Sequence, residues 1–194
     1  MRLKEKVSII TGAASGFGRG IAKKFSEEGA KLILVDINKD LLEKVSKDLN
    51  QDFFYTDVSS SSSMEKLSEY VLKKYQTIDI MVNNAGITHL PKPLEEVGEE
   101  EFDKVFAVNS KSVFLCGKYF VPHMKKQKKG SILNISSTAG ISPRPNLNWY
   151  NASKGWMITA TKAMAVELAP FNVRVNSLAP VAGETPLLKS FLGK

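Results

Sequence analysis

Runs of apolar residues alternate with stretches of helical periodicity from one end of the chain to the other. The strand candidates are 6–11, 31–36, 51–55, 78–83, 131–136 and 173–178. The helix candidates are 17–28, 39–49, 61–75, 99–126 and 150–169. The strand candidates are apolar throughout, as expected when both faces of a sheet are buried. This order of elements predicts an α/β fold with a doubly wound parallel sheet and helices on both of its faces.

No linker or repeat divides the 194 residues, so the pattern predicts a single domain over 1–194. The last strand candidate is followed by Ala-Pro-Val-Ala-Gly-Glu-Thr-Pro-Leu-Leu, which is typical of the start of a loop or lid. A parallel strand has a neighbour on each side unless it forms an edge. We therefore expect the sheet to lack a C-terminal strand.

The formal charge of +7 suits an anionic partner, but the lysines are scattered over several predicted helix faces. None of them alternates with aromatic residues, and we predict no nucleic-acid partner. The densest cluster, 125–129, falls where a helix should end. Cations there complement the helix dipole, and Gly130 is expected to supply the C-cap.

The sequence has no apolar run of 18 residues and no signal-peptide pattern at its start, so we expect no membrane partner. Its one cysteine, Cys116, lies in an apolar helical run and is expected in the core. A lone cysteine fits a reducing compartment, and the expected location is cytoplasmic. His89 and His123 are far apart and have no carboxylate pair beside them, so no metal site is predicted.

A glycine-rich segment, Thr-Gly-Ala-Ala-Ser-Gly-Phe-Gly at 11–18, follows the first strand candidate and opens the first helix. Its glycines are Gly12, Gly16 and Gly18. They permit a tight turn and a close approach of backbone N–H groups to a pyrophosphate at the helix N-terminus. A flexible turn is the alternative. The flanking strand and helix favour phosphate binding.

Asp36 ends the second strand candidate, eighteen residues after Gly18. An acidic side chain at this distance accepts hydrogen bonds from the adenosine ribose and repels a 2′-phosphate. Ser15 is neutral and offers no basic clamp, so the sequence favours NAD over NADP. Two alternatives stay open: Asp36 caps the next helix, or Arg19 and Lys39 bind the 2′-phosphate of NADP.

Tyr150 and Lys154 are four residues apart at the start of a predicted helix and share one face of it. At ~4 Å and an effective dielectric of ~20, the ammonium would favour phenolate by about 4 kcal/mol. A tyrosine with its pKa lowered in this way can act as a general acid or base near neutral pH. Ser137, thirteen residues before Tyr150, can hydrogen-bond a carbonyl oxygen. An ordinary solvated helix face is the alternative.

Together these motifs resemble the short-chain dehydrogenase/reductase family, in particular members of the 3-oxoacyl-ACP reductase and glucose 1-dehydrogenase type. The resemblance covers essentially the whole chain. Further matching positions are Asp57 with Val58, the segment Asn83-Asn84-Ala85-Gly86, Asn109, and Pro180 with Thr185. The family's thirteen-residue spacing selects Ser137 over the adjacent Ser136. The resemblance implies a Rossmann-type fold and an oxidoreductase.

The resemblance also implies a role for each matching residue. The implied catalytic residues are Asn109, Ser137, Tyr150 and Lys154. The implied cofactor-binding residues are Gly12, Ser15, Gly16, Phe17, Gly18, Asp36, Asp57, Val58, Asn84, Ala85, Gly86, Tyr150, Lys154, Pro180 and Thr185. The implied reaction is hydride transfer between NAD(H) and a secondary alcohol or ketone, with Tyr150 as general acid/base. Ser137 would hold the carbonyl oxygen, Lys154 the nicotinamide ribose, and Asn109 a water that relays protons.

Some alternatives stay open. The chemistry could use NADP(H) on a 3-oxoacyl thioester, or the chain could be a catalytically silent cofactor-binding regulator or scaffold. Asn109 could be an ordinary polar helix residue, and Trp149 either shapes the substrate pocket or packs against its loop. Relatives usually continue for some fifty residues more, so the substrate-covering segment is expected to be absent or only begun at 181–194.

The resemblance further implies a small-molecule alcohol or ketone as substrate. It also implies a homo-oligomer, a tetramer or dimer built on the helices 99–126 and 150–169. The apolar residues on these helices suit an interface and a monomer core about equally. They are Phe114, Leu115, Trp156, Met157 and Met164.

Overall fold

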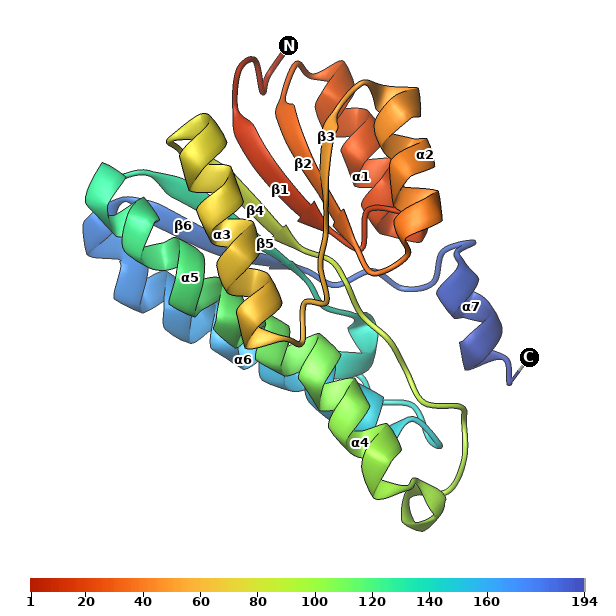
Figure 1. Cartoon of the computed structure of the whole chain (residues 1–194). Helices are drawn as coiled ribbons and strands as arrows, with labels where there is room; N and C mark the ends of the chain where they lie inside the picture. Colours follow the sequence, from red (N-terminus) through yellow and green to blue (C-terminus); the bar gives the residue numbers. More distant parts are fainter. Residues whose placement is uncertain (194) are drawn as a thin grey trace.

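Six strands form one sheet with the order β3-β2-β1-β4-β5-β6 (Figure 1). The structure is a computed structural model that describes residues 1–193. The strands are β1 (Val7–Thr11), β2 (Lys31–Asp36), β3 (Asp52–Tyr55), β4 (Ile80–Asn83), β5 (Gly130–Ile135) and β6 (Val173–Leu178). All neighbouring pairs are parallel. The predicted Rossmann-type sheet is confirmed, and no strand follows β6 among the described residues.

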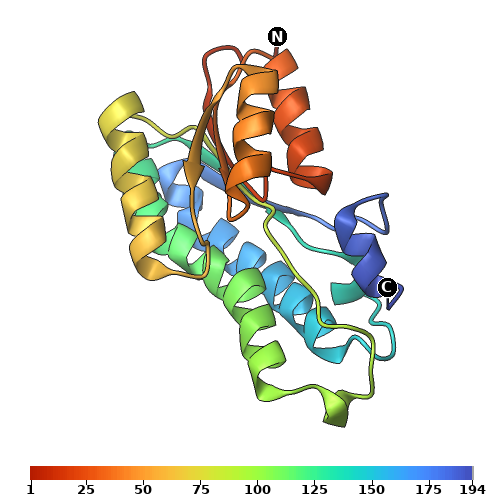
Figure 2. The ribbon, with the colours of Figure 1, turned by 45° about the vertical axis from the view of Figure 1, so that its right-hand side comes forward.

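Two layers of helices enclose the sheet (Figure 2). The helices are α1 (Gly16–Glu27), α2 (Lys39–Leu49), α3 (Ser61–Tyr75), α4 (Glu99–Phe106), α5 (Ser112–Gln127), α6 (Asn148–Leu168) and α7 (Pro186–Phe191). Short 3₁₀ turns occur at Leu94–Glu96, Thr138–Gly140 and Ala169–Phe171. The side chains of consecutive strand residues point to opposite faces of the sheet. Ile9 packs with apolar residues of α3, α5 and α6, whereas Ile10 packs with those of α1 and α2.

The strand order places a crevice at the carboxyl ends of β1 and β4. The chain runs outward from β1 in one direction to β3, and then outward from β4 in the other. Such a reversal is where open parallel sheets bind ligands. The Thr11 hydroxyl fixes this edge, because it donates to the Val82 carbonyl and accepts from the backbone N–H groups of Asn84 and Ala85.

The helix predicted over 99–126 is interrupted. A π-helical turn at Ala107–Lys111 separates α4 from α5. Such turns insert a residue into the helical ladder and are frequent at functional sites. The prediction for the end of α5 was wrong: Lys128, in the left-handed region at φ 52°, is the C-cap, and Gly130 is the first residue of β5.

The segment after β6, expected to be a loop or lid, contains α7. Thr185 is its N-cap and Pro186 its first residue, a position where proline's missing N–H costs nothing. The helix lies beyond the carboxyl ends of the strands, apart from the two covering layers (Figure 1). The expectation for 181–194 extends to Lys194, which lies outside the described residues.

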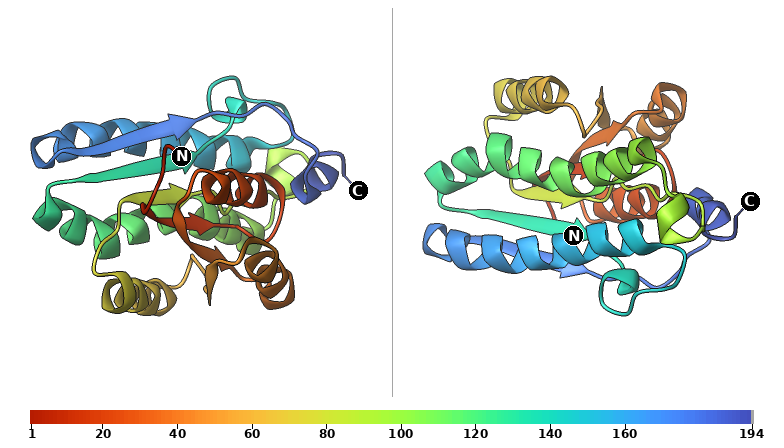
Figure 3. Two further views of the ribbon diagram at one scale, coloured as in Figure 1. Left: turned by 90° about the horizontal axis from the view of Figure 1, so that it is seen from above. Right: turned by 90° about the horizontal axis from the view of Figure 1, so that it is seen from below.

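The apolar residues of α5 and α6 divide between core and surface. Leu115 and Met157 are buried, and so is Cys116, as predicted. Phe114 and Trp156 remain 58% and 41% exposed. The two helices run side by side (Figure 3). Within residues 1–193, none of the helices combines the length and apolar character needed to cross a bilayer.

Candidate functional site

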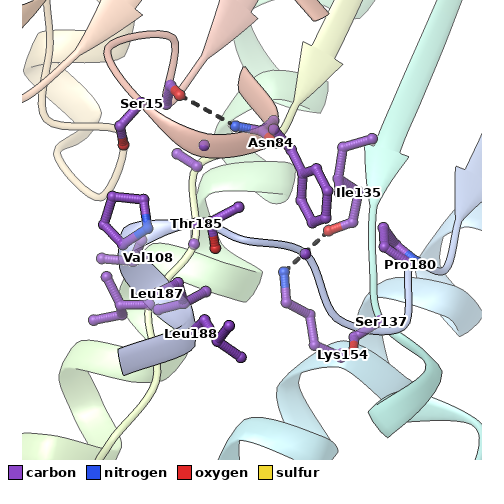
Figure 4. Close-up of a pocket in the computed structure, with 18 of the residues that line it drawn as sticks. Ser15, Asn84, Val108, Ile135, Ser137, Lys154, Pro180, Thr185, Leu187 and Leu188 are labelled. Carbon is purple, nitrogen blue, oxygen red and sulfur yellow. Dashed lines mark hydrogen bonds between the residues drawn. The ribbon is translucent and has the colours of Figure 1, made fainter. Parts of the chain in front are cut away.

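A groove with a volume of about 470 Å³ runs along the carboxyl edge of the sheet (Figure 4). Most of the residues selected from the sequence line it. They are Gly12, Ser15, Gly16, Phe17, Asp36, Asp57, Val58, Asn84, Ala85, Gly86, Ser137, Tyr150, Lys154, Pro180 and Thr185. Two of the selected residues, Gly18 and Asn109, lie behind this lining.

The glycine loop at 11–18 has little room for side chains. Gly12 and Gly16 adopt φ values of 66° and 51°, which favour glycine. A Cβ on Gly18 would lie 1.9 Å from the Gly12 carbonyl oxygen, so this glycine lets α1 approach the strand closely. The Ser15 side chain does not cap α1. The backbone N–H groups of the first turn therefore face the groove without a side-chain partner, which fits a pyrophosphate.

Asp36 is held at the far end of the groove. Its carboxylate accepts hydrogen bonds from the backbone N–H groups of Ala14 and Asn38, at 3.0 and 2.9 Å. The cap of α2 is Asn38, whose side chain accepts from the Leu41 N–H at 3.1 Å. The proposal that Asp36 caps α2 is therefore wrong. Its remaining lone pairs can accept hydroxyl groups.

Neither cation considered for a 2′-phosphate is free. Arg19 lies 3.6 Å from the Asp48 carboxylate. Lys39 lies 4.0 Å from the Glu43 carboxylate, one turn along α2. Each of these exposed pairs is weak. Even so, a phosphate would have to compete with a carboxylate for each cation.

Tyr150 and Lys154 project from the first turns of α6, and both are 4% exposed. The Lys154 Nζ donates to the Ile135 carbonyl oxygen at 3.0 Å (Figure 4). The same nitrogen lies 5.9 Å from the centre of the Tyr150 ring. Ser137, the second residue after β5, lines the groove with them. The shared helical face predicted for Tyr150 and Lys154 is confirmed.

The predicted lowering of the tyrosine pKa needs correction. Burial raises the pKa of Tyr150, while the Ser137 hydroxyl and the charge of Arg144 act in the opposite direction. The Lys154 ammonium, which was expected to lower this pKa, donates to the Ile135 carbonyl instead. Burial also lowers the pKa of Lys154 to about 8.

Asn109 is held by a closed set of hydrogen bonds. Its Oδ1 accepts from the Ile87 N–H, and its Nδ2 donates to the Ile87 carbonyl and to Ser153 Oγ, each at 2.9 Å. Ser153 in turn donates to the Tyr150 carbonyl at 2.7 Å. Asn109 is fully buried in the π-helical turn, so it is not an ordinary polar helix residue. It joins the strand-end loop to the turn of α6 that carries the tyrosine and the lysine.

Gly86 provides the space in which these groups meet. A Cβ at this position would lie 3.2 Å from Lys154 Nζ and 3.3 Å from Asn109 Oδ1. Both contacts are tighter than ordinary van der Waals packing. The loop after β4 therefore needs glycine here for a reason separate from cofactor binding.

The chain after β6 crosses the groove. A Cβ on Gly183 would lie 2.6 Å from Phe17 Cζ, so the backbone passes directly over that ring. At the other end of the segment, the Phe191 ring meets the Tyr150 ring edge-on, with 5.1 Å between their centres. The segment thus contacts both the glycine loop and the tyrosine.

Sequence reasoning missed several lining residues. They are Ile37, Thr56, Ile87, Lys104, Val108, Ile135, Ser136, Val181, Ala182, Gly183, Pro186, Leu187, Leu188 and Phe191. Lys104 and Val108 are one helical turn apart, but this spacing alone does not show that their side of the helix meets the groove. Trp149 does not line the groove and packs edge-on against Phe102, at 5.4 Å between ring centres. In the part of the chain that the structure describes, no three His, Cys, Asp or Glu side chains gather as metal ligands.

Comparison with known proteins gives a consistent result. Residues 6–192 match the family described as short chain dehydrogenase. The chain is 43% identical over 192 residues to the 3-oxoacyl-acyl-carrier-protein reductase FabG of Thermotoga maritima, covering 96% of this chain and 78% of that protein. It is 38% identical over 198 residues to a 4-formylbenzenesulfonate dehydrogenase of Comamonas testosteroni, covering 100% of this chain and 79% of that protein.

A solved structure agrees closely with the fold. The crystal structure of 3-ketoacyl-(acyl-carrier-protein) reductase from Brucella melitensis complexed with NADH superposes with a TM-score of 0.95 and 45% sequence identity. The match covers 97% of this chain and 80% of that one.

Proposed function

The chain belongs to the short-chain dehydrogenase family and is an oxidoreductase acting on alcohols or ketones, and we propose that it interconverts a secondary alcohol and a ketone with NAD(H). A bound nicotinamide coenzyme supplies or accepts the hydride. One observation carries the proposal. Ser137, Tyr150 and Lys154 line one end of a groove whose other end holds the glycine loop and Asp36.

Tyr150 is the general acid/base. In reduction its phenol gives a proton to the substrate oxygen, and in oxidation its phenolate takes that proton back. Ser137 donates a hydrogen bond to the same oxygen, which fixes its position and stabilises negative charge developing there. Both side chains are buried, so little water competes for the oxygen.

Lys154 and Asn109 support the tyrosine. The ammonium of Lys154 holds the coenzyme ribose, and a positive charge beside the phenol favours phenolate. Asn109 fixes Ile87 and Ser153, and through them the turn that carries Tyr150.

The experiment that tests the function is a turnover assay. Absorbance of reduced nicotinamide is followed with NAD and a panel of secondary alcohols at mildly alkaline pH, where oxidation is favoured. Turnover of at least one alcohol is the expected result. Saturable NAD binding without turnover of any alcohol or ketone would instead favour a cofactor-binding protein without catalysis.

NAD is expected to be preferred over NADP by at least about tenfold in kcat/KM, because Asp36 repels a 2′-phosphate and both nearby cations are paired. Asp36→Ser is expected to reduce the ratio of kcat/KM for NAD to kcat/KM for NADP, by lowering the first value and raising the second. Asp40→Ser, on the exposed start of α2, is the control and leaves the ratio unchanged. A tenfold preference for NADP in the unmodified protein would overturn the role given to Asp36.

The names of the similar proteins do not agree on one substrate. They include a 3-oxoacyl-acyl-carrier-protein reductase, a 4-formylbenzenesulfonate dehydrogenase and cyclopentanol dehydrogenase. A 3-oxoacyl thioester reduced with NADP(H) is therefore the second candidate reaction. The shape and charge of the substrate end of the groove give better evidence on the substrate class than these names do.

We also infer a homo-oligomer that forms through α5 and α6, since Phe114 and Trp156 leave large apolar areas exposed there. The expected mass in solution is two or four times 21.4 kDa. Trp156→Glu is expected to shift the protein towards monomer in analytical ultracentrifugation. Tyr55→Glu, at an exposed aromatic position on β3, is the control. A monomer at micromolar concentration in the unmodified protein would contradict the inference.

A further inference from the structure

The charged side chains that line the groove separate by sign. Asp36 and Asp57 line the end that lies beside β2 and β3. The other charged lining residues are both cations, Lys104 and Lys154. Lys154 is buried, whereas Lys104 is exposed on α4, which packs against the helix that carries Tyr150. No carboxylate therefore lines the groove around the tyrosine.

Lys104 is available to a ligand. It forms no ion pair with any residue in 1–193, although Glu100 lies one turn before it on the same helix. The neighbouring Glu101 is already engaged, because its carboxylate accepts from Lys92 Nζ at 2.8 Å.

A second cation stands near the tyrosine. Arg144 is exposed in the loop before α6, and its charge offsets part of the rise that burial gives the pKa of Tyr150. Its backbone carbonyl accepts a hydrogen bond from Asn151 Nδ2 at 2.7 Å, which ties the loop to α6. Like Lys104, it forms no ion pair within the described part of the chain.

The wall of the groove near the tyrosine is apolar. Val108 comes from the π-helical turn, and Leu187, Leu188 and Phe191 come from α7. Val108, Leu187 and Leu188 face the same space as Lys154 (Figure 4). The Phe191 ring stands edge-on to the Tyr150 ring. Such a wall favours a compact apolar group next to the reacting carbon and gives a second polar substituent no partner there.

We propose that the substrate is a ketone or secondary alcohol with a compact apolar body and an anionic group remote from the reacting carbon, and that Lys104 binds this anionic group. The inference rests on the proposed oxidoreductase function and names the substrate class for the same site. A carboxylate, a sulfonate and a phosphate share the required chemistry. Because Lys104 is exposed, its charge attracts and orients the anionic group but adds little binding energy.

The test compares 3-oxocyclohexanecarboxylate with its methyl ester, and 3-oxocyclohexanesulfonate with the matching sulfonamide, all at low ionic strength. Reduction by NADH is followed in the unmodified protein and in variants. The anions are expected to have a kcat/KM about fivefold higher than the neutral partners, mostly through KM. In Lys104→Gln the ratio falls to about one, and in Lys104→Glu it inverts. Salt at ~0.5 M reduces the ratio in the unmodified protein.

Lys111→Gln is the matched control, since Lys111 is an exposed lysine on the same helical run but does not line the groove. It is expected to keep the anion-to-neutral ratio. A ratio near one in the unmodified protein, or one that Lys104→Gln leaves unchanged, would overturn the inference. Either result still leaves ketone turnover that depends on Tyr150, so the proposed function survives. Failure of the function itself appears instead as no turnover of any ketone.

Discussion

Tyr150→Phe is expected to lower kcat/KM for a secondary alcohol by about 10²- to 10⁴-fold, the usual contribution of a positioned general acid or base. The substitution removes only the hydroxyl group. The ring that packs edge-on against Phe191 remains, so the fold and the NAD-binding groove are retained. NAD affinity, measured by fluorescence or calorimetry, is expected to change by no more than a few-fold.

Tyr119→Phe is the matched control, because it removes a phenol that is hydrogen-bonded to Ser61 at the start of α3 and does not line the groove. It is expected to retain normal turnover. If Tyr150→Phe kept more than about a tenth of the unmodified activity, Tyr150 would not be the general acid/base.

The pH dependence of turnover follows from the same phenol. Burial raises the pKa of Tyr150, so its phenolate becomes more abundant only as pH rises into the alkaline range. Alcohol oxidation needs the phenolate and should therefore accelerate with pH. Ketone reduction needs the phenol and should gain nothing from alkaline pH.

The fold was predictable because its signals are local. Continuous apolar strands alternating with helices leave few arrangements other than a covered parallel sheet. The tight turn of the glycine loop was equally predictable, because three closely spaced glycines between a strand and a helix are typical of such a turn. The π-helical turn at Ala107–Lys111 was not, because the 3.6-residue periodicity continues on either side of it. Its cause is tertiary: Asn109 turns inward to bond Ile87 and Ser153.

Most of the residues selected from the sequence line the groove, but their interactions could not be predicted. Spacing places Tyr150 and Lys154 on one helical face, but it does not say where the ammonium points. In the structure it faces the Ile135 carbonyl. Burial, which residue spacing does not reveal, raises the pKa of Tyr150 and lowers that of Lys154. Phe191 and Lys104 were missed because each enters the groove from an element whose packing depends on the whole fold.

Lys154→Met is expected to show opposite effects on activity and on stability. Activity should fall by about 10²-fold or more, because the ribose contact and the charge that favours phenolate are lost. Stability at pH 7 should rise. Burial lowers the Lys154 pKa from its ordinary 10.5 to about 8, a fall that corresponds to about 3 kcal/mol against the folded state. Loss of the hydrogen bond to Ile135 offsets about 1 kcal/mol of the gain.

The net gain of about 2 kcal/mol corresponds to a rise in Tm of roughly 4–8 °C at pH 7. The sign of its pH dependence is fixed. The folded-state pKa lies below the unfolded value, so from pH 8 to 10.5 the unfolded chain binds more protons and the unmodified protein gains stability as pH rises. The advantage of Lys154→Met should therefore be full below pH 8 and shrink above it.

Lys162→Met, an exposed lysine on the same helix, controls for the general effect of replacing lysine by methionine and should show no such trend. Calorimetry at pH 7 and pH 10 measures both variants against the unmodified protein. A Tm of Lys154→Met that does not exceed the unmodified value at pH 7 would mean that burial of the ammonium costs the fold nothing. The low pKa given to Lys154 would then be wrong. A stabilised but inactive variant would instead identify Lys154 as a charge kept at the expense of stability, because the proton transfer at Tyr150 needs it.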